Sequence, residues 1–138
     1  MPEPLDEPLG YLLYRVASAL RAEVSESALE PLNLSFPQYL CLRILSRFPG
    51  RSNAELARDL NVSPQATNVV LRSLEERGVV SRPASAASGR SLPAQLTREG
   101  SELLATLDTA VLAAEQRVLG PLTDAQRREF RQLLTRLG

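Results

Sequence analysis

Apolar positions repeat every three or four residues along most of the chain, which is the spacing of amphipathic helices. The pattern predicts a first helix over residues 8–30 and a second helix that begins at Ser35. The second helix carries Pro37 in its first turn and stops at Pro49-Gly50. The apolar stripes are Leu9, Leu12, Leu13, Val16, Leu20 and Val24 in the first helix and Tyr39, Leu42, Leu45 and Phe48 in the second.

Two shorter helices follow in the middle of the chain. Ser52 or Asn53 caps the third helix. The fourth opens with Ser63 as its N-cap and Pro64 at N1, and Gly78 supplies a left-handed C-cap. Helical periodicity places Thr67, Val70, Leu71 and Leu74 on the inner face of this helix and Gln65, Asn68, Val69 and Arg72 on the outer face.

A short hairpin comes directly after the fourth helix. Val79 and Val80 begin one strand, a loop of small residues follows, and residues 92–96 return as a second strand. Pro93 restricts the second strand to a sheet edge, because proline cannot donate to a ladder. Two helices joined by a tight turn and followed by such a hairpin predict a mainly α fold with a small β-wing, the winged helix-turn-helix.

Two more helices complete the chain. Thr97 caps the fifth, Gly120-Pro121 ends it, and Thr123 caps the sixth. Their apolar residues are Leu103, Leu104, Leu107, Val111, Leu112 and Val118, then Phe130, Leu133, Leu134 and Leu137. One small core cannot cover these residues together with the stripe of the first helix, so we expect a two-fold dimer. Residues 1–138 then form a single domain, with dimerisation helices in 1–34 and 101–138 and a DNA-binding lobe in 35–100.

Composition narrows the range of functions. At 138 residues the chain has no room for a separate catalytic module, and 43% hydrophobic residues with only 4% aromatics favour aliphatic helix packing. One cysteine and no histidine leave no internal disulfide and no usual zinc ligand set, so we expect neither metal nor cofactor. The acidic, proline-rich start is unlike a signal peptide and no apolar run is long enough to span a membrane, which predicts a soluble cytoplasmic protein.

Charge is unevenly distributed although the net charge is zero. Residues 1–30 carry six acidic side chains and two arginines, whereas residues 31–100 carry nine arginines and five acidic side chains. The first segment therefore has a net charge of −4 and the second +4. A basic middle is typical of a nucleic-acid reader, although solvated helix faces alone also produce such differences.

The first turns of the fourth helix hold side chains suited to reading DNA. Ser63, Gln65, Thr67 and Asn68 can bond phosphates or base edges, and a carboxamide can pair bidentately with adenine. Arg72, one turn further on, can reach a guanine or a phosphate. In an isolated helix the simpler interpretation, a serine cap with solvated amides, would be preferred. The adjacent hairpin reverses that preference.

Two arginines lie in the wing. Arg90 follows Ser88-Gly89, where the backbone bends freely, and its guanidinium is suited to a narrow minor groove. Arg82 begins the loop and is expected to meet phosphate. The alternative for both is an ordinary surface arginine.

Residues 34–100 resemble the MarR family of bacterial transcriptional regulators. The strongest matches are LSFPQYLCLRIL, ELARDLNVSPQATNVVLRSLEERGVV and LTREG. Many members carry Asp-Arg-Arg in the wing, and of the aligned residues here only Arg90 is retained. The resemblance implies a homodimer on double-stranded DNA with a pseudo-palindromic operator, usually a repressor released by a small phenolic ligand or by oxidation.

Cys41 and the tyrosines bear on how such a regulator would be released. The PQYLCL context is similar to the hydroperoxide-sensing branch, but there the reactive cysteine lies in the first helix, which has none here. Cys41 falls on a core-facing side of the second helix, where a thiol is inert, so a structural role is expected. Tyr11, Tyr14 and Tyr39 are candidates for a ligand cavity or for core and interface positions.

The main hypothesis is therefore a homodimeric, sequence-specific DNA-binding regulator. The alternative is a protein-interaction module that keeps the winged fold without specific DNA binding. An enzyme is disfavoured, because the chain has no histidine base and its carboxylates are scattered along solvated faces.

Overall fold

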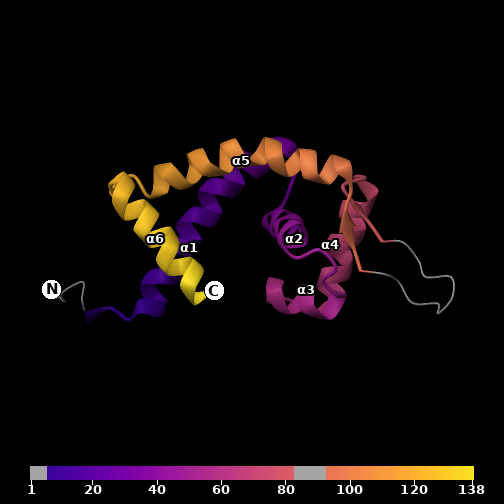
Figure 1. Cartoon of the computed structure of the whole chain (residues 1–138), viewed down its shortest axis with the longest axis horizontal. Coiled ribbons are helices and arrows are strands. Elements are labelled where there is room, and N and C mark those ends of the chain that lie inside the picture. Colours follow the sequence, from indigo (N-terminus) through magenta and orange to yellow (C-terminus); the bar gives the residue numbers. More distant parts are fainter. Residues whose placement is uncertain (1–5, 83–92) are drawn as a thin grey trace.

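A long helix, α5 (Arg98–Val118), runs along one side of the molecule with α1 (Leu9–Val24) packed beneath it (Figure 1). The structure is a computed structural model and describes residues 6–82 and 93–138. The other elements, in chain order, are η2 (Ser25–Leu29), η3 (Glu30–Leu32), α2 (Phe36–Arg47), α3 (Asn53–Leu60), α4 (Pro64–Glu76), β1 (Val80–Ser81), β2 (Gln95–Leu96) and α6 (Asp124–Leu137).

The first helical segment is less regular than predicted. α1 ends at Val24, and the chain continues through a π-helix, η2, and a 3₁₀ turn, η3. The Ser27 hydroxyl donates to the Glu23 carbonyl oxygen, and Pro31 has no N–H with which to continue an α-helical ladder. Asn33, with φ of 57°, then turns the chain toward α2.

α2 begins where the sequence predicts but ends one residue before the expected apolar stripe does. Ser35 forms a capping box with Gln38, which fixes the start. The prediction that Phe48 belongs to the apolar stripe of this helix is wrong. Phe48 lies beyond the last helical residue, and its side chain is 47% exposed. Its ring is covered instead by the guanidinium of Arg51, 4.6 Å from the centroid.

α2, α3 and α4, together with β1 and β2, form what we call the reading lobe. The start of α3 is fixed by a capping box between Ser52 and Glu55, and α4 starts where the Ser63 hydroxyl accepts from the Ala66 N–H. Hydrogen bonds from its own N-cap, led by the Ser52 backbone N–H, hold the pKa of Glu55 below its ordinary value. The lobe is built around leucines that are almost completely buried, Leu42 and Leu45 from α2, Leu56 from α3, and Leu71 and Leu74 from α4.

The two strands form a minimal antiparallel pair behind α4. Val80 is opposite Leu96 and Ser81 is opposite Gln95, so the second strand is shorter than the predicted 92–96 and begins after Pro93. Gly100 allows α5 to start close behind β1, because a Cβ there would lie 2.1 Å from the Val79 carbonyl oxygen. The predicted order of a helix-turn-helix and a small sheet is confirmed.

The terminal helices, by which we mean α1, α5 and α6, are arranged differently. α5 contributes Leu104, Leu107 and Val111 to the core, while α6 folds back from its far end and lies on the side away from the reading lobe (Figure 1). Within the described part of the chain, α6 buries none of its residues, although a capping box at Thr123 gives it a defined start. Its apolar side chains are therefore only partly covered within the described protomer, and Leu133, Leu134 and Leu137 are exposed.

Candidate nucleic-acid interface

The two faces of α4 separate core packing from exposed polar groups. Leu71 and Leu74 point into the lobe and are fully buried, whereas the opposite face is exposed along the length of the helix. The predicted DNA contacts on that exposed face are Ser63, Gln65, Asn68 and Arg72. The structure thus gathers four of the seven predicted contacts into one exposed row of polar side chains, beside which Val69 is also exposed.

Thr67 does not belong to this row, so its prediction as a DNA contact is corrected. Its side chain is completely buried, and its hydroxyl donates to the Ser63 carbonyl oxygen at 3.0 Å. A threonine at this position, four residues after the cap, satisfies its hydroxyl locally and packs its methyl group inward. The helical periodicity, which predicted Thr67 on the inner face, is confirmed, and the prediction that Thr67 contacts DNA is not supported.

Arg82 is also not a free phosphate contact in this structure. Its Nε donates to Glu75 Oε1 at 2.6 Å, and its side chain is only 18% exposed. Its Nη1 lies 3.4 Å from Asn68 Oδ1. The guanidinium therefore joins the wing to α4, a role that differs from the predicted one because Glu75 is close in space. Arg90, the other predicted wing contact, lies outside the described residues.

Asn53 is a residue of this face that sequence reasoning missed. Ser52 takes the cap of α3, which frees the Asn53 carboxamide to donate to Asn68 Oδ1 at 3.2 Å. The signal available in the sequence was the choice between Ser52 and Asn53 as cap, since the one not used for capping is free for a tertiary contact.

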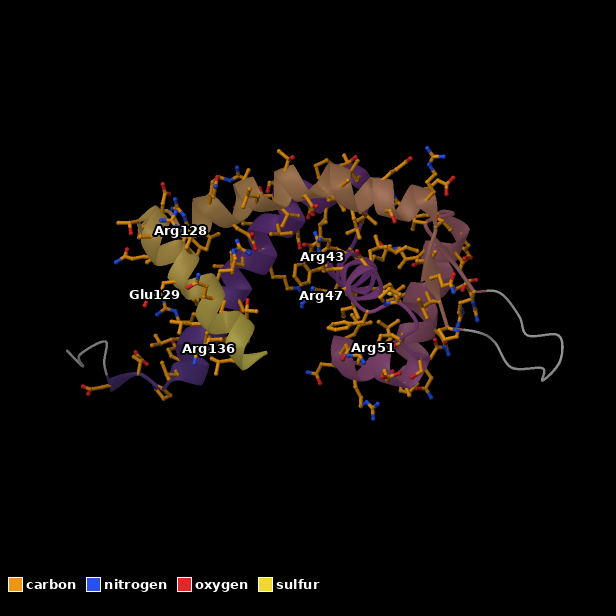
Figure 2. All side chains as sticks on the ribbon, in the orientation of Figure 1. Arg43, Arg47, Arg51, Arg128, Glu129 and Arg136 are labelled. Atoms are coloured by element: carbon orange, nitrogen blue, oxygen red, sulfur yellow. The ribbon has the colours of Figure 1, made fainter. Side chains whose placement is uncertain are left out.

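Three further arginines lie on the side of the reading lobe that is nearer to α1 and α6 in the view of Figure 2. Arg43 on α2 pairs with Asp108 on α5, with 2.5 Å between Nη2 and Oδ1. Arg51 bonds both Glu55 and Asp59 at 2.9 Å. These two arginines connect elements of the protomer to each other, and Arg47, the third, stacks over the Phe48 ring.

Cys41 is buried in the core, as the sequence indicates. Its side chain has no exposed surface, and burial raises the pKa of its thiol to about 12. A thiol with so little thiolate at neutral pH is a poor nucleophile, which supports a packing role.

The tyrosines divide between two environments. Tyr39 is buried, and its hydroxyl lies 3.4 Å from Arg43 Nη2. Tyr11 and Tyr14 are exposed on α1. This distribution fits a core position for the first and a surface position for the other two.

A groove of about 400 Å³ lies among the terminal helices. Leu20 of α1, Leu112 and Leu119 at the α5 end, and Phe130 and Leu134 of α6 supply its apolar lining. Charged side chains stand at its edge, among them Arg128 on α6 (Figure 2). An apolar groove with a charged edge is typical of a protein interface.

Other kinds of site find no support in the described ranges. Across residues 6–82 and 93–138, no three His, Cys, Asp or Glu side chains gather as a potential metal site. No helix of these two ranges has the length and apolar character required to cross a membrane.

Comparison with known proteins agrees with the arrangement described above. The MarR family model matches residues 34–92. The HTH-type transcriptional repressor Rv2887 of Mycobacterium tuberculosis is 57% identical over 133 residues, which cover 96% of this chain and 95% of the repressor. The crystal structure of the same M. tuberculosis protein in complex with salicylic acid has a TM-score of 0.82 and 57% identity, covering 96% of this chain and 98% of that one. Its complex with DNA has a TM-score of 0.80 and 53% identity, covering 96% and 99%.

Proposed function

We propose that this chain, which belongs to the MarR family, is a homodimeric transcriptional repressor that binds a pseudo-palindromic operator and is released by a small ligand. α4 enters the major groove and the wing lies beside it, so that each protomer reads one half-site. The protein catalyses no reaction in this scheme, and it acts in the cytoplasm, where operator DNA is found.

The observation that carries the proposal is the exposed polar row of α4 beside the strand pair. Gln65 and Asn68 offer carboxamides to base edges, and Arg72 offers a charged donor to guanine or phosphate. These polar residues lie on a helix whose opposite face packs in the core through Leu71 and Leu74. A rigid helix with a polar outer face is what a major-groove reader requires.

The terminal helices provide the surface on which a second copy packs. Their exposed leucines and the apolar groove among them have no partner within the described protomer, and a two-fold interface covers such surfaces on both copies at once. We therefore assign residues 1–34 and 101–138 to dimerisation and residues 35–100 to reading.

The effector is proposed from the relative. The M. tuberculosis protein, which is 57% identical, has been crystallised with salicylic acid. We propose that a small aromatic acid of that kind lowers the affinity of this chain for its operator as well.

A salt titration tests DNA binding directly. The probe is a duplex selected by the protein from a random pool, and affinity is measured by fluorescence anisotropy between low and moderate salt. If each protomer neutralises three or four phosphates, log affinity falls against log salt with a slope of about −5 to −7 for the dimer. A slope near zero, or equal affinity for a scrambled duplex, would favour the protein-interaction module.

A substitution on α4 provides the matched test. Arg72→Ala is expected to weaken operator binding by about 1–3 kcal/mol. Arg136→Ala, on α6 and outside the reading lobe (Figure 2), is the control and leaves affinity within about twofold. Salicylate added to the wild-type complex should release the duplex, and its failure to do so at millimolar concentration would remove the effector from the proposal.

A further inference from the structure

Asn68 is held in place by residues from two other elements. Its Oδ1 accepts from Asn53 Nδ2 on α3 at 3.2 Å and lies 3.4 Å from Nη1 of Arg82 in the wing. Arg82 is itself anchored by Glu75, which lies about two turns after Asn68 on α4. The Arg82 Nε donates to Glu75 Oε1 at 2.6 Å. The three elements of the reading surface thus meet at one side-chain oxygen.

The identity of that oxygen follows from the chemistry of its partner. A guanidinium has five N–H donors and no acceptor, so only the oxygen of a carboxamide can face it favourably. The orientation of the Asn68 amide is therefore determined by Arg82 and does not depend on the ambiguity between oxygen and nitrogen that affects an isolated asparagine.

This orientation limits what Asn68 can offer to DNA. Bidentate pairing of asparagine with adenine needs the oxygen to accept from the 6-amino group while the amide nitrogen donates to N7. Here the oxygen is already occupied by two donors, and only the NH₂ group of this exposed residue remains available.

We propose that Asn68 acts on DNA solely as a hydrogen-bond donor, held in that orientation by Arg82 and Asn53, so that it recognises an acceptor atom and not the edge of adenine. Its target is a purine N7, the O4 of thymine or a phosphate oxygen. Arg82 is then a positioning residue for specificity. The inference rests on the proposed DNA-binding function and goes beyond it by assigning the recognition chemistry of one side chain.

Base analogues test the assignment with the intact wild-type dimer. Each adenine in the selected half-site is replaced in turn by 7-deazaadenine, which lacks the N7 acceptor, or by purine lacking the 6-amino group. Guanines are replaced by 7-deazaguanine, thymines by 4-thiothymine, and phosphates by methylphosphonates. Every affinity is measured for the wild-type protein and for Asn68→Ala.

The expected result is one acceptor substitution that weakens the wild-type complex about tenfold and has no effect on Asn68→Ala. A response at N7 or O4 identifies a base as the target, and a response to a methylphosphonate identifies a phosphate. A loss on removing a 6-amino group that disappears in Asn68→Ala would show bidentate adenine reading and overturn the proposal. The absence of any substitution that distinguishes the two proteins would also overturn it.

A double-mutant cycle tests the positioning role of Arg82. Arg82→Gln should change base preference only at the position that Asn68 recognises, and it should have no further effect in Asn68→Ala. The salt slope should stay unchanged, whereas loss of a direct phosphate contact would reduce it by about 0.9 per protomer. Glu75→Gln should shift the same preference in the same direction by a smaller factor.

Arg98→Gln is the matched control for this cycle. Arg98 also pairs with a glutamate, Glu102, and lies next to the wing at the start of α5. Its substitution should leave base preference unchanged. If Arg82→Gln lowers affinity equally for every sequence and reduces the salt slope, Arg82 is a phosphate contact and the positioning role is wrong. If the wild-type protein itself has no sequence preference, the proposed function fails together with this assignment.

Discussion

The reading lobe buries its central leucines within one protomer, whereas α6 leaves its leucines exposed. In the lobe, Leu56, Leu71 and Leu74 are completely buried within one protomer. In α6, Leu133, Leu134 and Leu137 are between 43% and 84% exposed. The lobe leucines are therefore buried together with Leu104 and Leu107 of α5 in one core, whereas we propose that the α6 leucines are buried against a second copy. The folding of one region and the assembly of the other should respond to different substitutions.

The largest effect is expected from truncating the lobe core. Leu71→Ala removes a fully buried side chain and should lower the free energy of unfolding by about 2–5 kcal/mol, measured by urea denaturation. Val69→Ala is the control on the same helix, because Val69 is 67% exposed, and it should change stability by less than about 0.5 kcal/mol. Equal effects of the two substitutions would mean that α4 is not packed as described.

The next effect concerns assembly. Leu134→Glu places a charge in the apolar groove of the terminal helices and should weaken dimerisation by roughly 30-fold or more, equivalent to about 2 kcal/mol. Sedimentation equilibrium measures the change. Val62→Glu introduces the same charge at an exposed apolar position of the reading lobe and should leave the dimer intact. Dissociation caused by Val62→Glu and not by Leu134→Glu would reverse the assignment of the two regions.

A further effect, confined to alkaline pH, is the pH dependence contributed by Cys41. Its pKa is about 12 in the folded protein against 9.0 as the ordinary value, so above pH 9 the unfolded chain releases a proton that the folded chain retains. Stability should then fall from pH 9 toward pH 12, by at most about 1.4 kcal/mol per pH unit from this group. Cys41→Val should show a shallower decline in thermal unfolding over this range. Parallel curves for the two proteins would argue that the thiol is accessible to solvent.

The smallest effect tests the correction at Thr67. Thr67→Val keeps the shape and removes a hydroxyl that bonds only to the Ser63 carbonyl in the described structure, so stability should change by about 1 kcal/mol. Operator affinity should stay within about twofold, whereas Gln65→Ala on the exposed face should reduce it. A tenfold loss of operator affinity in a fully folded Thr67→Val protein would return Thr67 to the set of DNA contacts.

Local signals in the sequence were sufficient for the framework of the fold. Ser35, Ser63, Thr97 and Thr123 each cap the helix that the sequence assigns to them, because capping depends on residues only three positions apart. Periodicity also placed Leu42 and Leu45 of α2 and Leu71 and Leu74 of α4 correctly in the core, but it did not identify Leu29. It failed at Phe48, where the helix had already ended and an arginine covered the ring.

The site was less predictable, because its key contacts join residues that are distant in sequence. The interaction of Asn53 with Asn68 depends on how α3 crosses α4, and the pairing of Arg82 with Glu75 depends on the turn at Gly78. Hydrophobic periodicity contains neither relationship. A sequence reading could therefore identify which residues are polar and outward but not which of them hold one another.

The stoichiometry of the protein on its selected duplex tests the central claim most directly. Sedimentation velocity of the wild-type protein with an excess of duplex gives the mass of the complex. Two chains on each duplex are expected, because we propose that the exposed α6 leucines are buried against a second copy and that each reading lobe occupies one half-site. A single chain bound with full sequence specificity would contradict the account.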